Sequence, residues 1–208
     1  MTTQTVTIDI SRIDDLLPQT QCRQCGFDGC LAYARAIVED GVAINRCAPG
    51  GAAGIARLAA ATGRPVVSLA PDFGHEMPFA VARVRAADCI GCSWCVRVCP
   101  TGAVCGSPKH LHGILEEDCT GCALCVPACP MDCIELVENG HEWTLEDAHR
   151  ARELMHRTTA RRRADEAAEK ARLEAIRSEA KVRAPGVKSA LIADIMARAR
   201  KANQAGGR

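Results

Sequence analysis

The stretch Asp88-Cys-Ile-Gly-Cys-Ser-Trp-Cys-Val-Arg-Val-Cys-Pro100 occurs twice in this chain. It returns, offset by 30 residues, as Asp118-Cys-Thr-Gly-Cys-Ala-Leu-Cys-Val-Pro-Ala-Cys-Pro130, with 8 of 13 positions identical. Both copies read C-x2-C-x2-C-x3-C-P, so four cysteines lie within eleven residues, twice. Such crowding of thiols indicates metal or redox chemistry.

The spacing within each copy is that of bacterial proteins with two 4Fe–4S clusters. The first three thiolates lie on one loop and can take three corners of a cubane, whereas the fourth, directly before proline, ligates the other cluster. Structural zinc is the alternative, but zinc knuckles usually have two C-x2-C pairs separated by a longer loop. We therefore expect a two-cluster ferredoxin domain, with Cys89, Cys92, Cys95 and Cys129 binding one cluster and Cys119, Cys122, Cys125 and Cys99 the other.

A third cysteine set lies near the N-terminus, with the spacing C-x2-C-x4-C-x16-C. Four thiolates suit either a 4Fe–4S cluster or zinc, and the spacing favours a cluster. Gly26 and Gly29 fit a tight loop around a bulky inorganic core, and residues 31–38 suit a short helix over the site. The four candidate ligands are Cys22, Cys25, Cys30 and Cys47.

The composition leaves little material for a conventional core. The chain has 208 residues and 14 cysteines, but only 3% of its residues are aromatic. Disulfides are the competing explanation for the cysteines, but residues 1–9 have neither the basic nor the apolar region of a secretory signal, and thiols stay reduced in the cytoplasm. The longest uncharged run, residues 119–131, is too short to span a membrane.

Charge and cysteine content divide the chain. Residues 1–140 hold 10 Lys or Arg, 15 Asp or Glu and all the cysteines, whereas residues 141–208 hold 16 Lys or Arg and 10 Asp or Glu. Three bound clusters would lower the formal charge of the first part from −5 to about −11. The predicted organisation is an N-terminal 4Fe–4S domain (1–62), a linker (63–79), a two-cluster domain (80–138) and a basic helical tail (139–208).

The predicted fold class is α+β, with a small helical N-terminal domain, short antiparallel strands in the two-cluster domain and a helical tail. In the tail, Thr144 and Asp147 resemble a capping start, Pro185-Gly186 interrupts the helix, and Ser189 is placed to cap a last helix. The apolar stripe of that helix (Leu191, Ile192, Ile195 and Met196), followed by basic residues, suggests docking onto a partner or an anionic membrane.

These motifs together resemble the cluster-bearing B subunit of the Rnf (Rsx) ion-translocating electron-transport complex. The resemblance covers about residues 9–138 and rests on the following elements: Ile13-Asp-Asp-Leu-Leu-Pro-Gln-Thr-Gln-Cys22, Cys25-Gly-Phe-Asp-Gly-Cys30, Tyr33-Ala, Asn45-Arg-Cys-Ala-Pro-Gly-Gly51, and the double cysteine run that ends Cys129-Pro-Met-Asp-Cys-Ile134.

The resemblance implies a third 4Fe–4S cluster at the N-terminal set and electron transfer at the cytoplasmic face of the inner membrane. The implied partners are other redox proteins, including membrane subunits of the complex. Members of the family typically begin with a hydrophobic anchor helix, and this sequence begins directly at the cluster domain, so we expect a cytoplasmic or peripheral protein.

Two other functions stay open, a soluble ferredoxin-like electron donor to another oxidoreductase and a zinc-stabilised interaction module. We expect no stand-alone catalysis and no small-molecule substrate, since no nucleophile–base pair, phosphate loop or dinucleotide motif is present. Nucleic-acid binding is disfavoured because no aromatic residues alternate with the arginines of the tail.

Several residues near the motifs fall outside these sets. Cys105 and Cys133 are expected to be small buried packing residues, and His110 and His112 to lie on an ordinary loop or strand between the motifs. Trp94 either shields a cluster from water or belongs to the core.

Overall fold

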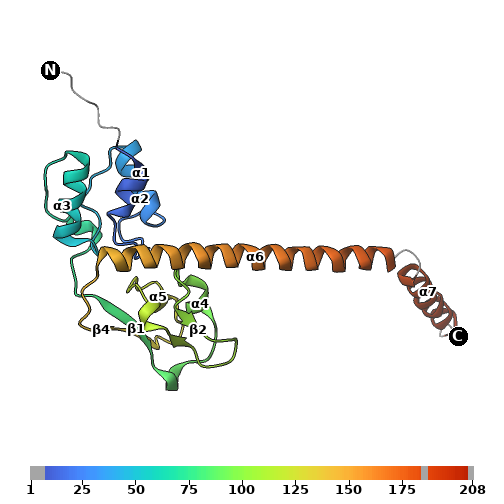
Figure 1. Ribbon diagram of the computed structural model, residues 1–208. Helices are drawn as coiled ribbons and strands as arrows, with labels where there is room; N and C mark the ends of the chain where they lie inside the picture. Colours follow the sequence, from blue (N-terminus) through green and yellow to red (C-terminus); the bar gives the residue numbers. More distant parts are fainter. Residues whose placement is uncertain (1–7, 184–186, 206–208) are drawn as a thin grey trace. The chain divides into compact units, whose positions relative to one another are not determined.

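The computed structural model describes residues 8–183 and 187–205 (Figure 1). These divide into two compact units, one ending at Thr159 and one beginning at Ala160. The first unit contains every cysteine of the chain, so the predicted sites all lie in it. The predicted domain boundaries stay predictions.

Three helices build the N-terminal module: α1 (Ile10–Asp15), α2 (Cys30–Glu39) and α3 (Gly51–Thr62). The carboxylate of Asp9 accepts a hydrogen bond from the Ser11 amide and so caps α1. Gly63, in the left-handed conformation, ends α3. The three helices enclose one core, and it includes three cysteines. Its buried members are Ile13, Leu17, Cys25, Cys30, Tyr33, Ala34, Ile37, Ile44, Cys47, Ile55, Leu58 and Ala59.

The following module consists of four short strands and two short helices, in the order β1 (Ala80–Val84), α4 (Trp94–Val98), β2 (Val104–Cys105), β3 (Gly113–Ile114), α5 (Cys125–Ala128) and β4 (Ile134–Glu138). Single 3-10 turns occupy Pro71–Phe73, Ala86–Asp88 and Glu116–Asp118. Strand β1 pairs antiparallel with β4, and β2 pairs antiparallel with β3.

The sequence repeat is also a structural repeat. In one sheet Val84 is paired with Ile134, and in the other Ile114 is paired with Val104. Val84 and Ile114 are equivalent positions of the two copies, 30 residues apart, and so are Val104 and Ile134. Each cysteine loop is followed by a short helix, α4 or α5. The core between the two copies has no aromatic side chain and includes five cysteines. Its buried members are Ala82, Cys95, Cys99, Ala103, Val104, Cys125, Cys129, Cys133 and Ile134.

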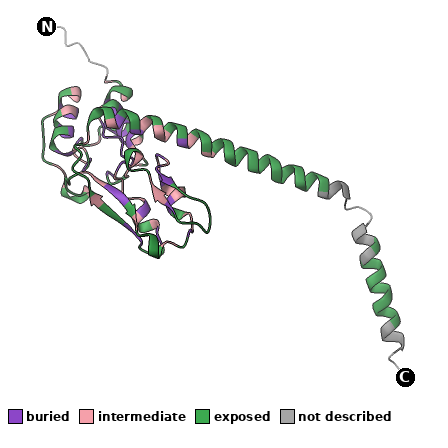
Figure 2. Cartoon of the chain, turned by 60° about the horizontal axis from the view of Figure 1, so that its bottom comes forward, coloured by how far each residue is buried: buried purple, intermediate pink, exposed green. Residues whose placement is uncertain are grey.

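Helix α6 (Leu145–Arg183) begins with the predicted cap. The Thr144 amide donates to the Asp147 carboxylate at 2.8 Å, and the Asp147 amide donates to the Thr144 hydroxyl at 3.2 Å. The first turns of α6 are buried at Ala148 and Ala151, inside the first unit (Figure 2). This part of the predicted tail is therefore integral to the cysteine-bearing unit.

The second unit contains the rest of α6 and α7 (Val187–Ala205), and its described side chains are almost all exposed (Figure 2). In this unit Arg172 and Glu169 form an exposed ion pair one turn apart on α6. The interruption at Pro185-Gly186 lies outside the described residues, although α6 ends before it and α7 begins after it. The predicted cap at Ser189 is wrong, because α7 already begins at Val187.

The predicted α+β class is confirmed, with helices at both ends and short antiparallel strands between them. Within the described residues, none of the helices is long and apolar enough to cross a membrane.

Candidate metal centres

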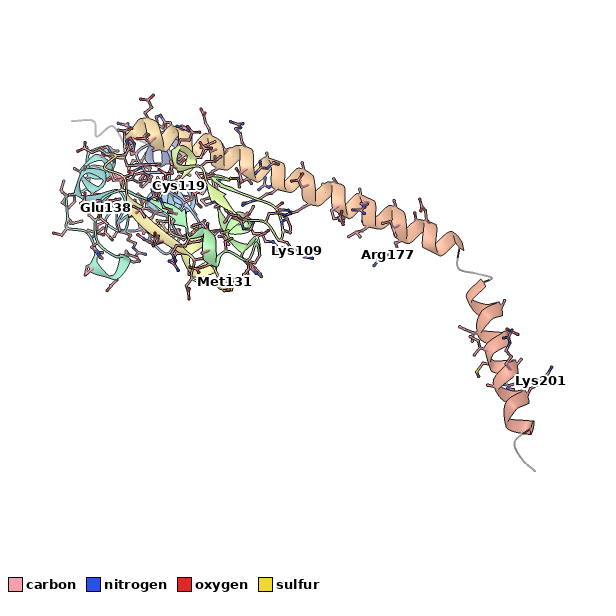
Figure 3. All side chains as sticks on the ribbon, turned by 90° about the horizontal axis from the view of Figure 1, so that it is seen from below. Lys109, Cys119, Met131, Glu138, Arg177 and Lys201 are labelled. Carbon is pink, nitrogen blue, oxygen red and sulfur yellow. The ribbon has the colours of Figure 1, made fainter. Side chains whose placement is uncertain are left out.

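Three cavities lie in the first unit, and each is lined by one predicted set of four cysteines. Each encloses about 290 to 340 Å³ of space, including solvent at its mouth. The N-terminal cavity is lined by Cys22, Cys25, Cys30 and Cys47; the first-repeat cavity by Cys89, Cys92, Cys95 and Cys129; and the second-repeat cavity by Cys119, Cys122, Cys125 and Cys99. Cys119, on the loop before α5, is labelled in Figure 3.

The N-terminal cavity is shaped by the loop that leads to α2. Cys30 is the first residue of α2, and its amide donates to the side-chain oxygen of Gln21 at 3.1 Å. A side chain at Gly29 would place its Cβ 2.5 Å from that oxygen, at a φ of +100°, so only glycine fits there. Gln19 in turn accepts from Gln21 at 2.8 Å and donates to Asp14 at 2.9 Å. This glutamine chain fixes the loop that carries Cys22 against α1 and α2.

The two repeat cavities exchange their last cysteines. Cys129, from the second copy of the motif, lines the cavity of the first copy, and Cys99 lines that of the second. Two glycines permit the close approach of backbone to each loop. A Cβ at Gly91 would lie 2.5 Å from the His110 amide nitrogen, and one at Gly121 would lie 2.5 Å from the Ala80 carbonyl oxygen. Each repeat cavity thus brings together three cysteines of one copy and the last cysteine of the other, and the exchange of ligands between the clusters stays a prediction.

Burial makes the thiols of these cavities reluctant to ionise by themselves. It raises the pKa of Cys30 to about 12 and also raises the pKa of Cys47, and at both thiols the neighbouring cysteine sulfurs oppose a negative charge as well. In the second-repeat cavity, burial and the neighbouring cysteines raise the pKa of Cys125 to about 12. Such clusters of thiols exist as thiolates only when a positive centre replaces their protons.

The surroundings of the sulfurs suit bound, negatively charged thiolates. Backbone amides of Phe27, Gln21 and Gly50 donate to Cys25, Cys30 and Cys47 and oppose the rise in pKa of each. In the N-terminal cavity the Thr20 hydroxyl oxygen is buried without a hydrogen-bond partner among the described residues. A buried hydroxyl is expected to have a partner, and the sulfur of a cluster would supply one. The donor set and its surroundings therefore fit 4Fe–4S clusters.

The described residues contain no group of three or more His, Cys, Asp or Glu side chains arranged to hold a single metal ion. In each set the cysteines instead surround a cavity.

Two residues outside the predicted sets belong to the first-repeat cavity. His112 is 2% exposed, and its Nδ1 lies 3.7 Å from the Cys89 sulfur. Cys133 is buried, and its sulfur lies 3.2 Å from that of Cys129. His112 lies on the loop between the motifs, directly before β3, as expected for a loop or strand residue, but its burial beside Cys89 was not predicted. The repeat could have indicated this burial, because position 112 is equivalent to Ala82, which is buried in β1.

The remaining expectations have mixed outcomes. Cys133 is buried as predicted, but Cys105 is exposed, so its predicted burial is wrong. It ends the two-residue strand β2, whose alternate residue, Val104, faces the core. Trp94 is 52% exposed and stacks with Arg97, whose guanidinium carbon lies 5.3 Å from the ring centroid, which excludes the core interpretation.

Comparison with known proteins supports the two cysteine-bearing modules separately. Residues 82–136 match the family model of the 4Fe-4S dicluster domain, and residues 17–49 match a family described as "Putative Fe-S cluster". The expected two-cluster ferredoxin domain is therefore confirmed as a domain type.

Several relatives are named as the B subunit of an ion-translocating oxidoreductase complex. The chain is 46% identical to that of Azoarcus sp. strain BH72 over 107 residues, which are 51% of this chain and 58% of the relative. It is 48% identical to that of Hahella chejuensis over 128 residues (62% and 64%) and 49% identical to that of Pseudomonas paraeruginosa over 130 residues (61% and 66%). The predicted resemblance to the B subunit is confirmed.

The chain spans less than two thirds of the length of each of these relatives. No solved structure matches it.

Proposed function

We propose that this chain is an electron-transfer protein that holds three 4Fe–4S clusters, one in each cysteine-lined cavity, and acts as the B subunit of an Rnf-type complex. The observation that carries the proposal is the coincidence of three cavities with the three cysteine sets. Bound in these cavities, such clusters would supply sites that accept and return single electrons. The protein's own contribution is to supply the thiolates, to space the sites and to cover them.

A direct contact joins the N-terminal cavity to the second-repeat cavity. Thr20 lines the former and Thr120 the latter, and the Thr120 hydroxyl donates to the Thr20 carbonyl oxygen at 3.1 Å. The two repeat cavities adjoin through the exchanged cysteines Cys99 and Cys129. The sites therefore follow one another in the order N-terminal, second-repeat, first-repeat, and electrons pass along this series.

Helix α6 and the segment before it contact both modules of the first unit and hold them in place. Arg152 forms an ion pair with Asp14 of the N-terminal module at 3.0 Å, and the Thr158 hydroxyl donates to the Thr101 carbonyl oxygen of the repeat module at 2.9 Å. Before the helix, the Trp143 indole donates to the Pro18 carbonyl oxygen at 2.9 Å. A fixed separation between redox sites preserves the rate of electron transfer along the series, and these contacts supply it.

The partners follow from the same proposal. Relatives named as subunits of an ion-translocating oxidoreductase complex point to membrane subunits of such a complex. Anaerobic co-purification from detergent-solubilised membranes is expected to recover those subunits with the chain. Recovery of a water-soluble oxidoreductase alone would favour the second candidate, a soluble electron donor that uses the same three sites.

A reductive titration tests electron transfer itself. The anaerobically purified protein is expected to be brown, to bleach on reduction and to take up about three electrons per chain, one for each cluster. A colourless protein that contains zinc and takes up no electrons would overturn the proposal in favour of a zinc-stabilised module.

A further inference from the structure

The two repeat cavities are built from equivalent residues. Ten residues line the first-repeat cavity, and each has a counterpart offset by 30 residues that lines the second-repeat cavity. Four cysteines correspond, and Val84 and Ile134 have the apolar counterparts Ile114 and Val104. The remaining four pairs differ in chemistry, namely His112 and Ala82, Cys133 and Ala103, Ile90 and Thr120, and Met131 and Thr101. Among the ten residues that line the first-repeat cavity, the chemical differences from the second-repeat cavity are therefore confined to these four positions.

His112 belongs to a chain of three groups that exists only in the first copy. Its Nδ1 faces the Cys89 sulfur at 3.7 Å and its Nε2 lies 3.3 Å from the Ser93 hydroxyl. An iron-bound thiolate has no proton to give, so the nitrogen that faces it must donate. The Ser93 hydroxyl can then donate to Nε2 and fix this orientation of the ring. In the second copy, the counterparts of Ser93 and His112 are Ala123 and Ala82, so the chain is missing there.

The backbone is shaped to admit the imidazole. A Cβ at Gly106 would lie 2.2 Å from the His112 Cδ2 atom, and Gly106 has a φ of +146°, so a larger residue there would displace the ring. Ser93 itself has a φ of 65°, and its counterpart Ala123 has a φ of 61°. The two loops therefore share the left-handed conformation at this position, where their side chains differ.

Cys133 places a second donor at the same site. When Cys129 is an iron-bound thiolate, the S–H group of Cys133, whose sulfur lies 3.2 Å from that of Cys129, is the donor in this contact. Its counterpart Ala103 has only a methyl group. A negative charge on the Cys129 sulfur is thus stabilised by Cys133.

The second-repeat cavity has hydroxyls instead, but their protons are directed elsewhere. Thr101 lies 3.7 Å from the Cys99 sulfur and donates to the Asp118 carbonyl oxygen at 2.8 Å. Thr120 lies beside Cys122 and donates to the Thr20 carbonyl oxygen at 3.1 Å. A hydroxyl has a single hydrogen, so these two groups contribute less to the sulfurs than His112 and Cys133 do.

We propose that His112, positioned by Ser93, and Cys133 raise the reduction potential of the cluster in the first-repeat cavity above that of its structural twin. Reduction adds negative charge to a cluster and its thiolates, and a hydrogen-bond donor at sulfur stabilises that charge. The inference rests on the proposed function, because it requires clusters in both cavities. Between the two repeat sites, an electron would then reside preferentially at the first-repeat site.

Redox titration of the anaerobic holoprotein, followed by electron paramagnetic resonance, tests the inference. The variants His112→Ala and Cys133→Ala install the residues of the twin site, and each is expected to lower one of the three midpoint potentials and leave two unchanged. For His112→Ala we expect about a tenfold fall in the ratio of reduced to oxidised cluster, ~59 mV for a one-electron couple. Ser93→Ala should shift the same transition by less, and His112→Asn, which retains an N–H donor, should restore part of the potential.

Two matched controls are available in the same module. His110→Ala removes an exposed histidine two residues away, and Cys105→Ala removes an exposed thiol. Both should leave all three potentials unchanged.

Iron and sulfide content, measured on the same samples, separates the possible failures. Unshifted potentials in His112→Ala and Cys133→Ala with a full content of iron would overturn the inference and leave the proposed function standing. If His112→Ala loses iron, its potential cannot be compared with that of the wild type, and the test is made on Ser93→Ala instead. A wild-type potential in Ser93→Ala would then overturn the role of His112. Absence of iron from the wild-type protein would instead overturn the proposed function.

Discussion

At the scale of single residues, cysteines that look alike in the sequence have different roles. Cys47 is buried in the N-terminal cavity among three other thiols, whereas Cys105 is exposed at the end of β2. We expect Cys47→Ser to lose about four iron atoms per chain, because a cubane has lost one of its four thiolates. Cys105→Ser is the matched control and should retain all of them, as measured by iron analysis after anaerobic purification.

The two cysteines outside the ligand sets give a complementary prediction. Cys133 lies beside Cys129 without belonging to the predicted ligands, and Cys105 lies outside all three cavities. The double variant Cys105→Ser/Cys133→Ser is expected to keep the full content of iron. A loss of one cluster's iron would mean that Cys133 is a ligand and that the assignment of Cys129 is wrong.

The cysteines that line the three cavities could be predicted from the sequence, because their spacing is the one that the size and geometry of a cubane require. The placement of His112 could not, because it depends on a turn-rich segment whose path from β2 to β3 has no comparable constraint in the sequence. Its distance of 3.7 Å from Cys89 arises only when Gly106 lets the imidazole pack inward. Spacing motifs thus predict the cysteines that line a cavity better than the other side chains that lie beside those cysteines.

At the scale of elements, the composition of α6 does not indicate that its first turns are buried. Its high content of charged residues predicts a solvated helix, and the helix is indeed exposed beyond Thr159. In its first turns, however, alanines are buried, and these turns contact both modules of the first unit. The capping pair Thr144 and Asp147 could be predicted from the sequence. The burial could not, since two alanines and a threonine among charged residues do not form a recognisable apolar stripe.

The ion pair between Arg152 and Asp14 gives a direct test of this bridge. Asp14 is buried, and Arg152→Ala removes the positive charge beside its carboxylate, so that the carboxylate keeps only the Gln19 side-chain amide as a donor among the described residues. The loss should destabilise the first unit by about 1–3 kcal/mol. The expected result is a lower temperature for the loss of cluster absorbance on heating. Arg172→Ala removes an exposed ion pair on the same helix and should leave that temperature unchanged. Equal effects of the two variants would contradict the bridging role.

Helix α7 has the apolar residues Ile192, Ile195 and Met196 exposed, together with an ion pair between Arg198 and Asp194. The docking hypothesis predicts that the variant Ile192→Asp/Ile195→Asp co-sediments less with vesicles that contain anionic lipid. Ile176→Asp, on an exposed part of α6, is the control and should bind like the wild type. Unchanged sedimentation of the α7 variant would reject membrane docking through this stripe.

At the scale of the whole molecule, the three proposed clusters would replace much of the missing hydrophobic core. The cores of both modules include cysteines of the predicted ligand sets, and the repeat module has no aromatic side chain in its core. Residues 1–140 carry a formal charge of −5 before clusters bind and about −11 afterwards. We therefore expect the association rate with a basic redox partner to fall steeply as salt is added, in stopped-flow measurements. A rate independent of salt would contradict electrostatic steering.

The central claim is that three cavities hold three 4Fe–4S clusters, and the content of iron and acid-labile sulfide tests it most directly. The protein, purified without oxygen at known chain concentration, is expected to contain about 12 iron and about 12 sulfide per chain. About 8 of each, with zinc making up the difference, would contradict the count of three by assigning zinc to one site. Zinc without sulfide would contradict the redox account as a whole.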